Sequence, residues 1–453
     1  MKNINVKSFG AVLFALATGH CLAGQTADTG EGTVFRGIFG DSLERDYGIK
    51  VSGLLDAGYS RNNNSSHVDR ESGQTNTPVA GFGDENFELA TLHLFADKAL
   101  KANFIPRVTP LPGPAPTEAS FGFTFETAYG RNAQQARTYG WDMHWGINSP
   151  GDDDPDKARR DKQNFLAVPN IAATAYLPYA GGFTAIAGIF GPALGYEIPP
   201  NVRAARNPFA SRSYAFMTES GAVSGFLLGK RLINNSNMLL GAELGVIQGQ
   251  GNLRDNNDSK ALLGALRWRT PDMNTWIDYE FLVGDSQNDS RNDIQTPRGR
   301  LISADGQFKQ QHSLNGWHKL NEQWSMGGEM VYGRQSGDGK ASTVDIVTGP
   351  GFDGAHWWGA NVVLTYQQRK DLSFSVRAEH FDDPDGYVLF PSSTARGAFN
   401  ALTTGLRYDF NKYLSLRPEL RYDWFDGRDD ARPFGQGDAR NQLTGTVEAL
   451  VYF

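Results

Sequence analysis

Cysteine, long apolar runs and a basic excess are all scarce or missing in this 453-residue chain. Its single cysteine is Cys21, so a disulfide cannot hold the fold together. No apolar run of about 18 residues follows the N-terminal segment, which excludes helical membrane spans. Lys and Arg number 43 against 50 Asp and Glu, so nothing favours nucleic-acid binding. The 28 Phe and 16 Tyr exclude a disordered chain. What remains suits a large soluble β protein or a membrane β-barrel.

The N-terminal segment has the layout of a secretory signal peptide. Lys2 and Lys7 supply positive charge, a short apolar core follows at 11–17, and Cys21 and Ala23 are small residues before a cleavage site. We interpret 1–23 as this signal peptide, with a buried N-terminal helix as the alternative. A lipoprotein signal is disfavoured because His20 precedes the cysteine.

Two further units follow the signal peptide. Residues 24–47 are interpreted as a short periplasmic or lumenal segment, in which Asp41–Arg45 forms one helical turn with Asp41 or Ser42 as the N-cap. Residues 48–453 are interpreted as an outer-membrane β-barrel.

From about residue 48 onward, apolar and polar residues alternate with a period of two. In 276–283, Ile277, Tyr279 and Phe281 share one face, opposite Asp278 and Glu280. The windows 49–60, 120–129, 372–379 and 414–424 show the same pattern, and no helical periodicity competes with it. The sequence therefore predicts strands that each have an apolar and a polar face.

The connections between these strands alternate between short and long. The short ones are rich in turn-forming residues and lie near 180–182, 234–237, 271–274, 321–323, 369–371 and 411–413. Eight long ones lie near 61–84, 130–163, 191–220, 249–258, 285–305, 334–354, 382–399 and 426–441. This asymmetry predicts an all-β, antiparallel transmembrane barrel of about sixteen strands, with short periplasmic turns and long extracellular loops. A soluble sandwich is the alternative, and the segment 85–120 is ambiguous because 87–96 alternates poorly and 106–116 is rich in proline.

Closure of the sheet follows from the membrane, because hydrocarbon offers no partner for a backbone N–H or C=O. The apolar face then contacts lipid and the polar face lines the lumen. Pro418 conflicts with this pattern, because proline cannot donate to a ladder, and is interpreted as a bulge or strand-end position. The terminal Phe453 closes an alternating strand and is similar to the signal through which the barrel-assembly machinery recognises its substrates.

The polar faces of the later strands supply the candidate pore lining. Eight acids and six bases share these faces, so a net charge of about two negatives is too small to predict strong cation selectivity. The alternative is that these charges only pair across strands and stay hydrated. The candidates are Arg267, Asp278, Glu280, Lys309, Glu329, Arg377, Glu379, Arg407, Asp409, Arg417, Glu419, Arg421, Asp423 and Glu448.

The long loop at 191–220 is the candidate constriction. It lies in the first half of the chain and mixes charges with aromatic residues, although it could instead shield the outer rim. Its candidate residues are Glu197, Arg203, Arg206, Arg212 and Tyr214.

Three stretches resemble the OmpL-like β-barrel porin family. They are 47–51 leading into 57–59, then 195–197 followed by 207–214 (NPFASRSY), and 377–383 (RAEHFDD) running into 385–386. The resemblance spans most of the mature chain and implies an outer-membrane channel for small solutes. Family members often have a shorter link than 106–116.

Chemical motifs are mostly absent from the sequence. We find no nucleophile elbow, HExxH, P-loop or cysteine-based metal cluster, so we expect no enzyme, cofactor or metal. The leading prediction is a porin for passive diffusion of small hydrophilic solutes, located in the bacterial outer membrane. A barrel with a blocked lumen and a structural or adhesive role is the alternative, and an outer-membrane hydrolase is a weaker one. Expected partners are outer-membrane lipids, lipopolysaccharide and, by analogy, other copies of the chain.

Overall fold

The computed structural model describes residues 33–64, 87–142, 145, 165–191, 194–197, 207–219, 221–255, 258–285, 308–337, 344–345, 349–350, 354–389, 395–435 and 437–453. The interpreted signal peptide, 1–23, lies outside the described residues and stays a prediction.

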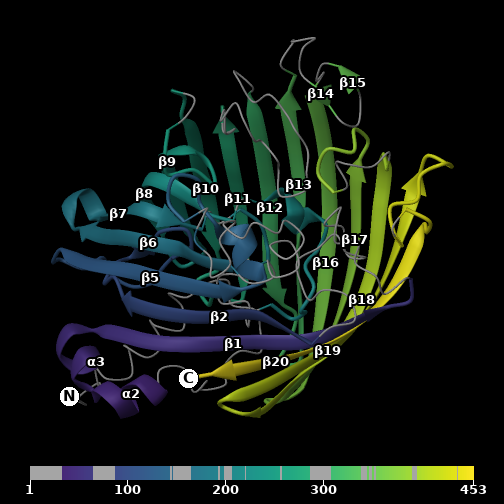
Figure 1. Ribbon diagram of the computed structural model, residues 1–453. Coiled ribbons are helices and arrows are strands. Elements are labelled where there is room, and N and C mark those ends of the chain that lie inside the picture. Colours follow the sequence, from purple (N-terminus) through teal and green to yellow (C-terminus); the bar gives the residue numbers. More distant parts are fainter. Residues whose placement is uncertain are drawn as a thin grey trace.

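Sixteen strands form one closed barrel in which each strand pairs antiparallel with the next (Figure 1). The predicted fold class and strand number are confirmed. The strands are β1 (Ile49–Asn62), β2 (Phe87–Lys98), β5 (Ser120–Gly130), β6 (Phe165–Leu177), β7 (Phe183–Phe190), β8 (Val223–Asn234), β9 (Leu239–Gln250), β10 (Ala261–Arg269), β11 (Thr275–Gly284), β12 (Lys309–Lys319), β13 (Trp324–Ser336), β16 (Gly354–Arg369), β17 (Leu372–Asp383), β18 (Gly397–Asn411), β19 (Leu414–Gly427) and β20 (Asn441–Tyr452).

The barrel closes between its first and last strands, β1 and β20, where Leu54 pairs with Tyr452. The last residue extends this closure, because Phe453 and Gly53 exchange both backbone hydrogen bonds, at 3.0 and 2.7 Å. The Phe453 ring covers Gly53 so closely that a Cβ there would lie 2.2 Å from a ring carbon. Every strand edge is therefore paired, as a sheet in hydrocarbon requires.

The predicted faces of the strands are confirmed. On β11, Ile277 and Tyr279 are exposed on the outer face, whereas Asp278 and Glu280 are completely buried on the inner face. On β17, Phe374 and Val376 face outward and Arg377 faces inward. The outside of the barrel thus presents the large apolar side chains that a bilayer accepts.

The predicted short turns connect the strands at one end of the barrel, and the long loops connect them at the other. The ambiguous segment 85–120 contains β2, the start of β5 and the connection 99–119 between them. That connection holds a small hairpin of β3 (Phe104–Ile105) and β4 (Thr109–Pro110). A second small sheet pairs β14 (Val344–Asp345) with β15 (Gly349–Pro350) in a long loop.

Two short helices precede the barrel, α2 (Thr33–Phe39) and α3 (Ser42–Tyr47). Asp41 is the N-cap of α3, and Gly48 ends the helix in the left-handed conformation, with φ of 69°. The predicted helical turn is therefore present and is longer than expected. Figure 1 shows the helices beside the start of β1 and near the C-terminus, where the Phe35 ring lies 5.9 Å from that of Phe453. Neither these helices nor any other in the described ranges has the length and apolarity to cross a bilayer.

The interpretation of Pro418 as a bulge or strand end is wrong. Pro418 lies inside β19 and pairs with Val447 of β20. Towards β18, the ladder runs from Gly405–Glu419 directly to Tyr408–Leu416 without a change of register. The missing proline N–H thus falls where the ladder skips rungs, so the strand continues without a bulge.

Candidate constriction in the barrel lumen

The loop between β7 and β8 folds inward and packs on the inner wall of the barrel. Its described parts are 194–197 and 207–219, and the latter includes a 3₁₀ turn, η4 (Ala215–Thr218). Tyr196, Phe209 and Tyr214 have exposed fractions of only 2%, 1% and 0%. Side chains of an outer-rim loop would face solvent, so this loop is a lumenal element.

Carboxylates of the wall hold the backbone of this inward loop. Glu280 on β11 accepts the Gly195 N–H at 2.7 Å, and Glu329 on β13 accepts the Tyr196 N–H at 3.0 Å. Two strands further along the wall from β13, Glu379 on β17 accepts the Tyr214 N–H at 2.7 Å. The loop is therefore fixed to the arc of the wall that runs from β11 to β17.

Glu419 on β19 adds a further anchor. It accepts the Ala210 N–H at 2.8 Å and the Ser211 N–H at 3.2 Å. Since Glu419 is itself buried, these two amides satisfy a charge that would otherwise be costly to hold away from water.

Arginines of the wall bind the carbonyl side of the loop. Arg421 donates to the Arg212 carbonyl at 3.0 Å, and Arg417 donates to the Asn207 carbonyl. Arg377 donates to the Ser211 carbonyl at 3.1 Å and forms an ion pair with Glu197 at 2.7 Å. Glu197 in turn accepts the Ser213 N–H at 2.6 Å. One wall arginine thus connects both described parts of the loop.

A charge network on the inner faces of β9, β10 and β11 shares Glu280 with these anchors. Arg267 contacts Glu243 at 2.5 Å, Asp278 at 2.6 Å and Glu280 at 2.8 Å. Asp278 also pairs with Arg269. All five side chains are buried, so each charge is compensated by neighbours instead of water.

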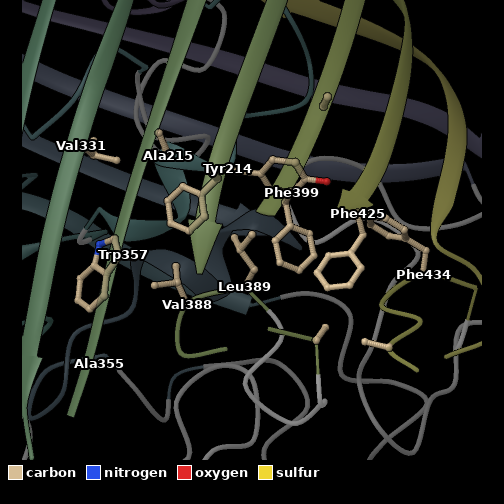
Figure 2. Close-up of a cluster of buried hydrophobic side chains, with 14 residues drawn as sticks. Tyr214, Ala215, Val331, Ala355, Trp357, Val388, Leu389, Phe399, Phe425 and Phe434 are labelled. Carbon is tan, nitrogen blue, oxygen red and sulfur yellow. The ribbon is translucent and has the colours of Figure 1, made fainter. Parts of the chain in front are cut away.

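An apolar core fills part of the lumen next to the loop (Figure 2). Tyr214 and Ala215 of the loop pack there with Trp357 of β16, Phe399 of β18 and Phe425 of β19. Residues from the connections β17–β18 and β19–β20, including Val388, Leu389 and Phe434, complete the cluster. Three connections therefore share one apolar core. The sequence predicted a polar inner face and gave no indication of this core.

Glycine makes room for the loop at one close approach. The Tyr196 hydroxyl lies against Gly327 of β13, where a Cβ would come within 2.2 Å of the oxygen. Any larger residue would have to displace the tyrosine.

Burial perturbs the ionisable groups of the loop. It raises the pKa of Tyr196 and of Tyr214 above the usual tyrosine value, and lowers the pKa of the Arg212 guanidinium. Burial and the neighbouring Glu329 raise the pKa of Glu219 well above its usual range. The Glu219 Oε1 atom has no hydrogen-bond partner within the described ranges. The loop therefore ends at a carboxyl group that neutralises easily.

The structure places all the pore-lining candidates on the inner face of the wall. Most are buried and contact the loop or one another, so they are not directly in contact with solvent. Arg407 and Asp409 are the partly exposed ones, with side-chain exposures of 11% and 13%. Of the loop candidates, Glu197, Arg212 and Tyr214 take part in the seating of the loop, whereas Arg203 and Arg206 lie outside the described residues.

Sequence reasoning missed several residues of this region. Glu243 sits on the inner face between Gly241 and Gly245, and its alternation with exposed Leu244 could have revealed it. Asn361 donates to Glu329 at 2.9 Å but carries no charge to attract attention. In the part of the chain that the structure describes, no group of His, Cys, Asp or Glu has the geometry to hold a metal ion.

A family model for beta-barrel porin-2, OmpL-like (BBP2), matches residues 48–453. The chain belongs to this porin family. It lies in the bacterial outer membrane, as the predicted localisation stated. The expected resemblance is confirmed over nearly the whole described barrel.

Solved structures share the porin fold at low sequence identity. OprB of Pseudomonas putida matches with a TM-score of 0.53 at 11% identity, covering 94% of this porin and 99% of OprB. The outer membrane channel DcaP of Acinetobacter baumannii matches with 0.52 at 12%, covering 89% and 97%. OmpF of Salmonella typhi matches with 0.50 at 12%, again covering 89% and 97%. The search of curated proteins gave no match.

Proposed function

We propose that this porin lets small hydrophilic solutes diffuse passively across the outer membrane through a water-filled lumen. The observation that carries the proposal is a closed sixteen-strand barrel with an apolar outer face and a charged inner face. A closure of this size is wide enough to leave an aqueous channel, whereas eight strands would be filled by side chains. No covalent step is involved, so the protein acts without enzymatic activity or a cofactor.

The inward loop sets the narrowest part of this path. Arg377, Arg417 and Arg421 hold it at β17 and β19, and on nearby β13 Glu329 is bonded to neutral donors. We propose that the loop held in this position narrows the lumen, so the size and charge of a solute decide its passage. We propose that most pore-lining candidates act by fixing the loop, while Arg407 and Asp409 also contact the lumenal water.

A second candidate function is a barrel whose lumen is blocked and whose role is structural or adhesive. The nearly complete burial of the inner-face charges and the apolar core at Tyr214 favour it. The two candidates differ in conduction alone, so one experiment separates them.

Purified protein in planar lipid bilayers tests the proposal. A porin gives discrete conductance steps, and liposomes that contain it swell in small sugars. Bilayers that stay sealed at every voltage, together with liposomes that do not swell, would refute diffusion and leave the blocked barrel. Assays of lipid and peptide hydrolysis with the same preparation test the absence of enzymatic activity.

The partners of the barrel are proposed from its surfaces. The exposed apolar belt contacts outer-membrane lipids, and the long loops lie at the level of lipopolysaccharide. Phe453, which completes the closure against Gly53, is the residue we propose that the barrel-assembly machinery recognises. The yield of folded Phe453→Ala in outer-membrane fractions tests this role, and crosslinking in native membranes tests self-association.

A further inference from the structure

The connection between β2 and β5 does not turn at the rim of the barrel. It enters the lumen from the end opposite the long loops and lies on the inner faces of β7 to β10. Asn103, Phe104, Thr109 and Leu111 in this connection are all buried. The part of this connection from 103 to 111 is therefore packed on the wall, whereas 112–114 are exposed.

The wall is shaped to receive this hairpin. The Phe104 ring is completely buried and lies over two glycines of the inner face. A Cβ on Gly229 would come within 2.3 Å of the ring, and one on Gly241 within 2.4 Å. Because a side chain at either position would overlap the ring, these glycines form the seat of Phe104.

Polar side chains of the wall hold the hairpin on its other sides. Arg269 donates to the Thr109 hydroxyl at 3.0 Å and to the Val108 carbonyl at 2.8 Å. Arg231 donates to the Gly113 carbonyl at 2.8 Å, and Asn103 of the connection donates to the Gly181 carbonyl at 2.8 Å. Bonds from several strands fix the position of the hairpin in the lumen.

Arg107 occupies the tip of the hairpin. Its backbone has a positive φ of 63°, which is unfavourable for a residue with a side chain. Its N–H donates to Glu243 at 2.8 Å, and its guanidinium donates to the Gly191 carbonyl and lies 5.3 Å from the Phe190 ring centre. Gly191 directly follows β7, so Arg107 joins the hairpin to the start of the inward loop.

The Arg107 side chain is half-buried, so part of its guanidinium reaches the lumen. Its Nε is buried without a hydrogen-bond partner in the described part of the chain, and Glu243 is the nearby carboxylate. Burial lowers the pKa of its guanidinium to about 10, so the group remains positive at neutral pH.

We propose that the connection 99–119 is a second constriction, in which Arg107 is a specificity-determining residue that favours small anions over cations. This inference rests on the proposed diffusion function. The hairpin occupies lumen beside β7 to β10, and its fixed positive charge raises the local concentration of anions. Size is then limited by two elements from opposite ends of the barrel, joined at Arg107 and Gly191.

Arg107→Gln in planar bilayers under a KCl gradient tests the charge. We expect its reversal potential to shift towards cation selectivity, whereas Arg107→Lys keeps the wild-type value. Glu118→Gln is the matched control, because Glu118 is exposed in the same connection. We expect no shift from it. An Arg107→Gln channel with the wild-type reversal potential would overturn the charge assignment.

A second variant tests the constriction itself and does not depend on the arginine. Residues 102–116 are replaced by a short Gly-Ser turn, and folding is checked by heat-modifiable migration on gels. We expect a larger unitary conductance and faster liposome swelling in larger sugars. An unchanged conductance in a folded variant would overturn the constriction while the diffusion function stands. A wild-type protein that does not conduct would instead refute the diffusion function, and the inference with it.

Discussion

Arg377→Met is expected to release the inward loop without opening the barrel. In the wild type, Arg377 is completely buried and donates to Glu197 at 2.7 Å, to Glu379 at 3.1 Å and to the Ser211 carbonyl at 3.1 Å. Methionine fills similar space but donates none of these bonds. The sixteen-strand ladder does not depend on this side chain, so the loss falls on the docking of the loop.

The size of the effect follows from what each carboxylate retains. Glu379 keeps Arg421 at 2.8 Å and the Tyr214 N–H, so it stays paired. Glu197 keeps the Ser213 N–H but loses its ion-pair partner. Removal of one member of a buried ion pair costs about 3 to 5 kcal/mol. Because one of the two carboxylates is still compensated, we expect the free energy of loop docking to fall by about 3 kcal/mol. This lowers the equilibrium constant for docking roughly a hundredfold.

Amide hydrogen exchange measures the fraction of molecules in which the loop is docked. The amides of Ser213 and Tyr214 donate to wall or loop carboxylates, so their protection reports the opening of the loop. In Arg377→Met we expect their protection to fall by about a hundredfold while strand peptides keep theirs. Arg369→Met, which removes an exposed pair with Asp371, is the control, and we expect it to leave the protection of these amides unchanged.

The double variant Arg377→Met, Glu197→Gln removes the uncompensated charge and should recover part of the protection. Full protection of the loop amides in Arg377→Met would refute the reasoning. An equal loss in β17 and β19 would do so as well, because it would mean that the arginine supports the barrel instead of the loop.

Two further predictions concern the same loop. Gly327→Ala places a Cβ against the Tyr196 hydroxyl and should reduce the free energy of loop docking by about 1 to 3 kcal/mol, measured as lost exchange protection at 194–197. Gly445→Ala is the control, because its Cβ meets no atom within 4 Å and should change no protection. Equal behaviour of the two variants would contradict the close approach. The folded-state pKa of Glu219 is raised, so the docked loop binds more protons than the released one, and its stability falls as the pH rises above the ordinary pKa of glutamate. Glu219→Gln should abolish this pH dependence of exchange protection, and a pH dependence identical to wild type would exclude Glu219 as its source.

The barrel itself is determined by the sequence. A strand shows its two environments along its own length, because lipid accepts the Ile277 side and excludes the Asp278 side. The lengths of the loops indicate which end of the barrel faces the periplasm, and each short turn connects two strands that are neighbours in the sequence. Fold class, strand number and the inner face could therefore be predicted from local pattern.

Only the tertiary structure decided what fills the lumen. Arg377 and Glu197 are 180 residues apart, and nothing near either residue in the sequence indicates that they pair. The same holds for Phe104 and its seat on Gly229 and Gly241, which lie on different strands. Closure of the sheet brings such residues face to face, and the position of a side chain across a closed sheet depends on the register of every strand between them. A period-two pattern identifies which face is inside, but it does not identify the partner on the opposite wall.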